Sequence, residues 1–190
     1  MSDSENSMFP NLEFLRHLET LTLHNKYVYY SINLEVFKFP PNIKRLTLKS
    51  TRIEWEEMSV LGMLLPNLEL LKLENHAAWG EQWETTDGGF PRLKFLKLME
   101  LDVEQWITCS SHFPRLQHLL LGWCKNLEEI PSGLGDMLTL QMIVVAFCPS
   151  SLEESARKIK EEQESIGNNW VKVLTRNTLQ SVSEEICILS

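Results

Sequence analysis

The chain has 190 residues, the length of one globular domain, with 18 Lys and Arg residues against 26 Asp and Glu residues and a formal net charge of -8. Because phosphate backbones bind basic surfaces, this charge argues against a nucleic-acid partner. The sequence has no apolar run of the length that spans a bilayer. Its first residues lack the basic start and apolar core of a secretory signal, so we expect a cytoplasmic chain.

One phrase recurs along the sequence every 23 to 25 residues. Its clearest copies are PNIKRLTL from Pro41, PNLELLKL from Pro66, PRLKFLKL from Pro91 and PRLQHLLL from Pro114, with weaker copies from Arg16 and Leu138. Each copy fits L-x-x-L-x-L, in which a short strand points its leucines inward and the intervening side chains outward. The pattern predicts an α/β leucine-rich-repeat solenoid of about six coils, with a short parallel sheet on the concave face and irregular convex loops.

The ends of the chain differ from the repeat. We expect a disordered start over 1–8, a repeat domain over 9–174 and a flexible tail over 175–190. A helical cap near 151–167 should cover the last coil, since its apolar residues fall on one stripe at helical spacing. That stripe comprises Leu152, Ala156, Ile159 and Ile166. Ser151 and Glu154 match a capping box, and Gly167 is placed to end the helix.

The outward residues of the strands are the candidate binding residues, because repeat proteins recognise partners with this surface. The residues that we predict to contact a protein partner are Arg45, Thr47, Lys49, Leu70, Lys72, Phe95, Lys97, His118, Leu120 and Trp123. A basic centre beside an apolar flank suits an acidic protein surface. The alternative is that the lysines are only solvated and that the later apolar rows lie beneath the C-terminal helix or tail.

The cysteine and histidine pattern predicts neither a metal site nor a cofactor. Cys124 and Cys148 occupy the same slot in neighbouring coils, where we expect thiols that bond the turn backbone rather than a disulfide. The spacing of Cys109, His112, His118 and Cys124 matches no standard zinc finger. The sequence also contains no nucleophile elbow or paired-carboxylate motif, so we do not expect an enzyme.

The last four residues, from Cys187 to Ser190, match a C-a-a-X box, and the terminal serine favours a farnesyl group. Glu184 and Glu185 stand where basic residues usually support such an anchor. Two interpretations stay open, namely prenylation of Cys187, which would place the protein peripherally on a membrane, and a chance tetrapeptide.

Several longer segments carry a family resemblance. WEEMSVLGMLLPNLELLKL, WGEQWETTDGGFPRLKFLKL, HFPRLQHLLLGWCKNLEEIPSGLGDMLTLQMIVV and SSLEESARKIKEEQESIG resemble the C-terminal leucine-rich repeats of plant intracellular immune receptors of the coiled-coil, nucleotide-binding class, especially late blight resistance homologues of nightshades. The resemblance implies a plant disease-resistance module that recognises a pathogen effector or host target, or restrains the receptor's nucleotide-binding (NB-ARC) module. No phosphate-binding G-x-x-x-x-G-K-(S/T) loop occurs in these residues, so we expect no ATP binding. The alternative is the substrate-recognition repeat of an F-box ubiquitin ligase.

Overall fold

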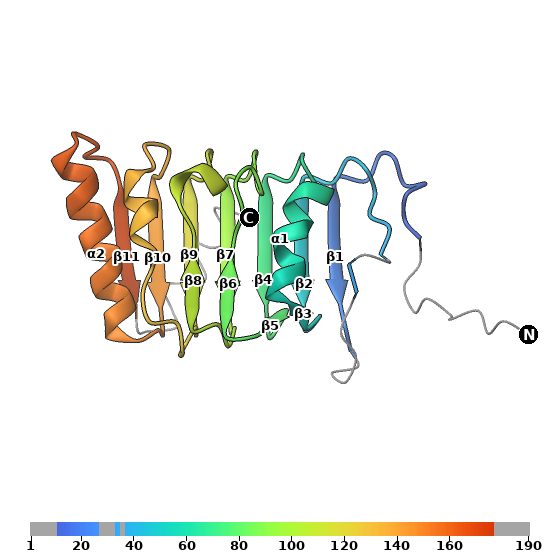
Figure 1. The fold of residues 1–190 in the computed structure, drawn as a ribbon, viewed down its shortest axis with the longest axis horizontal. Helices are drawn as coiled ribbons and strands as arrows, with labels where there is room; N and C mark the ends of the chain where they lie inside the picture. Colours follow the sequence, from blue (N-terminus) through green and yellow to red (C-terminus); the bar gives the residue numbers. More distant parts are fainter. Residues whose placement is uncertain (1–10, 27–32, 35–36, 177–190) are drawn as a thin grey trace, which may run out of the picture.

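A computed structural model of the chain describes residues 11–26, 33–34 and 37–176. Within these residues the main sheet has seven parallel strands, which neighbour one another in chain order (Figure 1). The strands are β1 (Thr20–His24), β2 (Arg45–Lys49), β4 (Leu70–Glu74), β7 (Phe95–Met99), β9 (His118–Gly122), β10 (Met142–Ala146) and β11 (Lys172–Arg176). The α/β class is therefore confirmed.

Each copy of the sequence phrase forms one strand, and the copies align without a shift. Leu46 pairs with Leu71, Leu71 with Leu96 and Leu96 with Leu119. Because side chains alternate between the two faces of a strand, these leucines form one row on one face, where each has at most 1% of its surface exposed. A shift of one residue would turn the whole row toward the other face, so burial of the leucines fixes the register.

The segments between the strands return over the inward face and are more regular than the sequence predicts. They form α1 (Trp55–Leu64), the pairs β3 (Ile53–Glu54) with β5 (Ala78–Trp79) and β6 (Gln82–Glu84) with β8 (Gln105–Ile107), and the 3-10 helices η1 (Ser110–His112) and η2 (Ser132–Asp136). The prediction of irregular convex loops was wrong for these residues. The hydrophobic pattern of α1 does not predict a helix, because apolar residues lie on its exposed side as well as its buried side.

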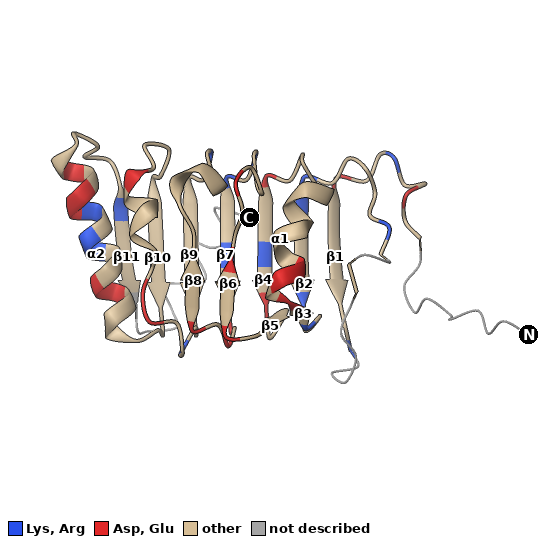
Figure 2. Ribbon diagram, viewed as in Figure 1, with Lys and Arg blue, Asp and Glu red and all other residues tan. Residues whose placement is uncertain are grey.

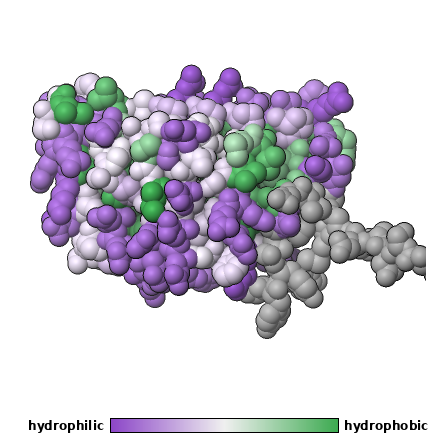
Figure 3. Space-filling model, in the orientation of Figure 1, coloured by the Kyte–Doolittle hydropathy of each residue, from purple (hydrophilic) through white to green (hydrophobic). Residues whose placement is uncertain are grey.

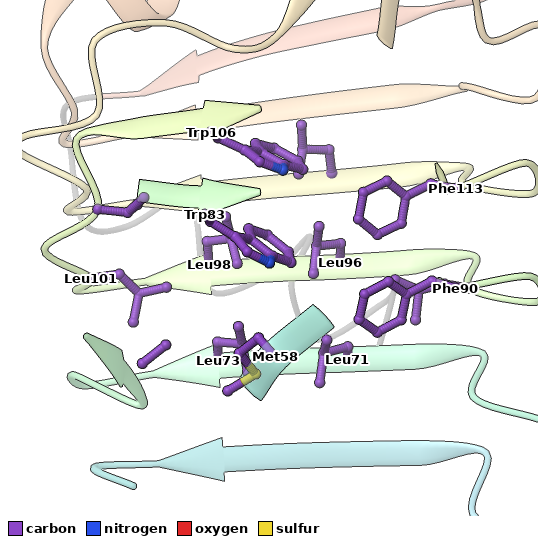
Figure 4. Packing of buried hydrophobic residues seen from close by; sticks show 14 of the residues in the cluster. Met58, Leu71, Leu73, Trp83, Phe90, Leu96, Leu98, Leu101, Trp106 and Phe113 are labelled. Atoms are coloured by element: carbon purple, nitrogen blue, oxygen red, sulfur yellow. The ribbon is translucent and has the colours of Figure 1, made fainter. Parts of the chain in front are cut away.

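Aromatic side chains fill the space between the sheet and the returning segments (Figure 4). The Trp83 ring stacks on Trp55 and Trp106, with centroids 4.9 and 5.1 Å away, and Phe90 stacks on Phe113 at 5.2 Å. Trp83 is fully buried. Successive repeats therefore join through these rings as well as through the leucine rows.

Helix α2 (Ser150–Ser165) follows the repeats, as predicted, and packs against η2, β10 and β11. Leu152, Ala156 and Ile159 are buried, and Gly167 lies in the left-handed region at φ 89° where the helix has ended. Ile166 was wrongly placed on the buried stripe, since it is 57% exposed.

The N-terminus and the buried face of α2 also differ from the sequence prediction. Its N-cap residue is Pro149, and no side-chain hydrogen bond caps the helix, so the predicted capping box does not form. Gln163 is buried in place of Ile166, and its Nε2 donates hydrogen bonds to the carbonyls of Gly135 and Met137. The helix then leads into β11, which extends to Arg176, past the predicted end of the domain at 174.

The predicted disordered start over 1–8 and the tail from 177, which includes Cys187, lie outside the described residues. Neither α1 nor α2, the two α-helices in the described part of the chain, has the length and hydrophobicity required to cross a membrane.

Candidate protein-binding surface

The strand register brings nine of the ten predicted binding residues onto one face of the sheet, opposite the leucine rows. We call this the outward face. Its rows are Arg45, Leu70, Phe95 and His118; Thr47, Lys72, Lys97 and Leu120; and Lys49, Glu74, Met99 and Gly122. The tenth residue, Trp123, follows the end of β9 and lies in the turn.

Accessibility changes along the outward face. Arg45 is exposed, and Thr47, Lys49, Leu70, Lys72 and His118 are partly buried. In contrast, Phe95, Lys97 and Leu120 have only 5%, 8% and 2% of their surfaces exposed. The predicted apolar flank of Phe95 and Leu120 is thus not accessible in this structure. On β2 and β4 the accessible residues include Arg45, Lys49 and Lys72, and Figure 2 shows the Lys and Arg positions of these strands in blue.

A carboxylate that the sequence analysis did not select organises the lysines. Glu74 accepts a hydrogen bond from Lys97 Nζ at 2.6 Å and pairs with Lys49 Nζ at 2.9 Å. Burial alone would raise the pKa of Glu74, but the two lysines outweigh it and the pKa lies below its usual value. The pair of Lys49 and Glu74 could have been predicted from the repeat, since its register places the two residues side by side on neighbouring strands.

Lys72 differs from Lys49 and Lys97, which both pair with Glu74. It pairs with no carboxylate among the described residues, and its Nζ lies over the Phe95 ring at 5.8 Å from the centroid. Burial lowers the pKa of Lys72, and the nearby charges of Lys97 and Lys49 lower it further, against an opposing effect of Glu74. An external carboxylate would relieve this repulsion.

Beside this region the strands begin with paired charges. Lys44 Nζ lies 2.7 Å from Glu19, and Lys94 Nζ lies 2.9 Å from Glu69. Both pairs are partly solvated and contribute little to stability. They nevertheless balance the charges of Lys44 and Lys94 where β2 and β7 begin.

His118 and Trp123 are constrained by aromatic neighbours. His118 lies 6.3 Å from the Phe95 ring, and burial lowers the pKa of its imidazole. Trp123 stacks on Phe147 with ring centroids 4.3 Å apart. Both residues of this stack have a left-handed backbone, with φ of 49° and 57°. The stack therefore belongs to the turns that follow β9 and β10.

Cys124 and Cys148 are free thiols that bond backbone carbonyls, as the sequence predicts. Cys109, Cys124 and Cys148 are free thiols, and Cys124 is fully buried, where its Sγ donates to the carbonyl of Leu98 at 3.6 Å. Its hydrogen bond with Cys148 and its burial raise the pKa of Cys124, so this thiol is unreactive.

Comparisons with known proteins find one group of similar plant proteins. No protein-family model matches the chain. The chain is 39% identical over 169 residues to the late blight resistance protein homolog R1B-8 of Solanum demissum, a match that covers 86% of the chain. It is 36% identical over 154 residues to homolog R1B-23 and 34% identical over 173 residues to homolog R1B-13 of the same plant. The chain is related to the late blight resistance protein homologues.

The late blight resistance homologues are much longer than the region they share with this chain. The matches cover 80 to 86% of the chain but only 12 to 15% of each relative. The similarity therefore extends over most of this chain and only a small part of each relative, and it confirms the family resemblance found in the sequence.

Proposed function

We propose that the chain is a leucine-rich-repeat solenoid that acts as a protein-recognition module in plant disease resistance. Its binding surface is the basic cluster of Arg45, Lys49 and Lys72, and the partner presents an acidic surface. The partner is a pathogen effector, a host target or the nucleotide-binding module of a receptor. We propose no catalytic activity.

Two observations support the solenoid. Every copy of the repeated phrase contributes one strand to the parallel sheet, and the strands neighbour one another in chain order. Each unit buries its leucines only against its neighbours, which is the way in which repeat proteins are stabilised. The names of the relatives favour a role in disease resistance over the alternative of an F-box ubiquitin ligase.

The charge on Lys72 is the observation that carries the proposed binding. The chain as a whole is acidic, yet Lys49 and Lys97 both pair with Glu74, and Lys72 beside them forms no ion pair with a described residue. The excess positive charge stands on a rigid sheet, so no ordering of loops is needed before a partner binds. Complementary charge accelerates the encounter and rejects partners with a basic surface.

The test is a comparative affinity capture from nightshade leaf extract with the full chain as bait. The test variant is Arg45→Glu/Lys72→Glu, which reverses two accessible charges. Lys97 is left intact, because reversing it would bury two carboxylates side by side and destabilise the fold. A matched control reverses the charge of Lys125, an exposed residue in the turn after β9.

We expect proteins with acidic surfaces to be retained by the wild-type chain and by Lys125→Glu. The double variant should retain at least about tenfold less, equivalent to 1.4 kcal/mol. Circular dichroism and urea unfolding confirm that both variants are folded. Equal retention by all three chains would refute binding through the basic cluster.

A further inference from the structure

Three side chains with metal-binding atoms meet on the side of the molecule opposite the outward face. Asp87 follows β6, and Cys109 and His112 follow β8, the strand that pairs with β6 (Figure 1). The Asp87 carboxylate, the Cys109 thiol and the His112 imidazole each offer one ligand atom, and all three atoms lie within 4.8 Å of one another. The group thus spans two successive repeats.

This group differs from the cluster of cysteines and histidines that stands out in the sequence. The sequence clusters Cys109 and His112 with His118 and Cys124, in a spacing that matches no zinc finger. The structure separates these pairs, because His118 lies on β9 and the Cys124 thiol donates to the Leu98 carbonyl in the core. Asp87, from the preceding repeat, takes their place beside Cys109 and His112.

The His112 ring is held in the orientation that a metal ligand needs. Its Nδ1 lies 2.7 Å from Thr85 Oγ1, and Thr85 Oγ1 in turn donates to Thr108 Oγ1 at 2.7 Å. In the tautomer with the proton on Nδ1, this nitrogen donates to Thr85 Oγ1, and Nε2 presents its lone pair on the side of Asp87. The Thr85 side chain is buried. Such a hydrogen bond behind a histidine is typical of metal sites.

The distance between His112 and Asp87 suits a shared cation. Nε2 lies 3.5 Å from Asp87 Oδ1, which is long for a hydrogen bond. Ligand bonds of about 2.0 to 2.3 Å in a tetrahedron place neighbouring ligand atoms roughly 3.3 to 3.6 Å apart. Ser111 Oγ bridges the other side of the group, donating to Asp87 Oδ1 and lying 3.0 Å from Cys109 Sγ. Rotation of the exposed Cys109 side chain would bring its sulfur to the same distance.

We propose that Asp87, Cys109 and His112 bind a zinc ion. One thiolate, one imidazole and one carboxylate form a donor set that zinc favours over calcium or magnesium, which prefer oxygen ligands alone. Water occupies the fourth position, because the Asp87 side chain is 85% exposed. The ion joins the segments that follow β6 and β8 and stabilises the folded chain, since these ligands come together only on folding.

The test is a titration of the reduced full chain with Co²⁺, which reports thiolate coordination by a charge-transfer absorption band. We expect the band to saturate at one equivalent and to disappear on addition of Zn²⁺, and we expect Zn²⁺ to raise the melting temperature. Cys109→Ser should abolish the band, whereas Cys148→Ser and Cys187→Ser should keep it.

Two further variants test the geometry. Asp87→Asn removes an exposed carboxylate without touching the core, and it should weaken Zn²⁺ binding at least about tenfold. Thr85→Val leaves all three ligands in place but frees the imidazole, and it should weaken binding about tenfold. Absence of the band in the wild-type chain would overturn the proposal, because His112 and Asp87 would then form only an ion pair. A band that persists in Cys109→Ser would overturn it as well.

Discussion

Replacing Glu74 by Gln tests the electrostatics of the outward face. The Glu74 and Lys97 side chains are 11% and 10% exposed and 2.6 Å apart. Removing one partner of a buried ion pair costs about 3 to 5 kcal/mol, because the remaining charge stays buried. The second partner of Glu74, Lys49, is 39% exposed and can turn to water. We therefore expect Glu74→Gln to lower the free energy of unfolding by about 3 kcal/mol.

The control is Glu69→Gln, at the residue just before β4, the strand that ends at Glu74. Glu69 pairs with Lys94 at 2.9 Å, but these side chains are 39% and 43% exposed. Solvent screens such a pair, so we expect a cost of about 0 to 1 kcal/mol, which 1 M NaCl removes. The assay is urea unfolding followed by tryptophan fluorescence, with and without salt. Equal costs for the two variants would refute the argument that burial decides the strength of the pair.

Three further predictions concern the pH dependence of stability, the stacked tryptophans and a close backbone approach. Since the pKa of Glu74 is lowered, the folded chain binds fewer protons than the unfolded chain near pH 4.5. The stability that Glu74 contributes should therefore be complete above that pH and should decrease as the pH falls through the folded pKa. Urea unfolding at pH 3 to 7 measures this decrease. Trp83→Ala should cost about 3 to 5 kcal/mol and Trp79→Ala, which is 43% exposed, less than about 1 kcal/mol in the same assay; equal losses would contradict the stacked core. Gly62→Ala should lower the melting temperature in calorimetry, because its Cβ would collide with the Gly89 carbonyl, and an unchanged temperature would contradict this close approach.

The strands were predictable because their information is local and repeated. A leucine at every second position, in phase over several copies, specifies both the strand and its register, as the row from Leu46 to Leu119 illustrates. The row positions of the predicted binding residues followed from that register. Their accessibility did not, because the burial of Phe95 and Leu120 depends on the packing around them.

The segments between the strands were less predictable. In α1 the exposed residues Met63 and Leu64 are apolar, as are the buried ones, so the helical period of its sequence is weak. Figure 3 shows a hydrophobic surface in the region of this helix. The β6 and β8 pair is three residues long, too short to show a period of its own. Tertiary packing determines these elements, and with them the meeting of Asp87 and His112.

Site-specific photo-cross-linking tests the central claim most directly. A photoreactive residue replaces Leu70, which lies on the outward face beside Arg45, and a control carries it at Lys158 on α2, whose side chain is 67% exposed. The protein retained by the wild-type chain in the capture experiment should cross-link from position 70 and not from position 158. Cross-linking from position 158 alone would contradict recognition through the outward face.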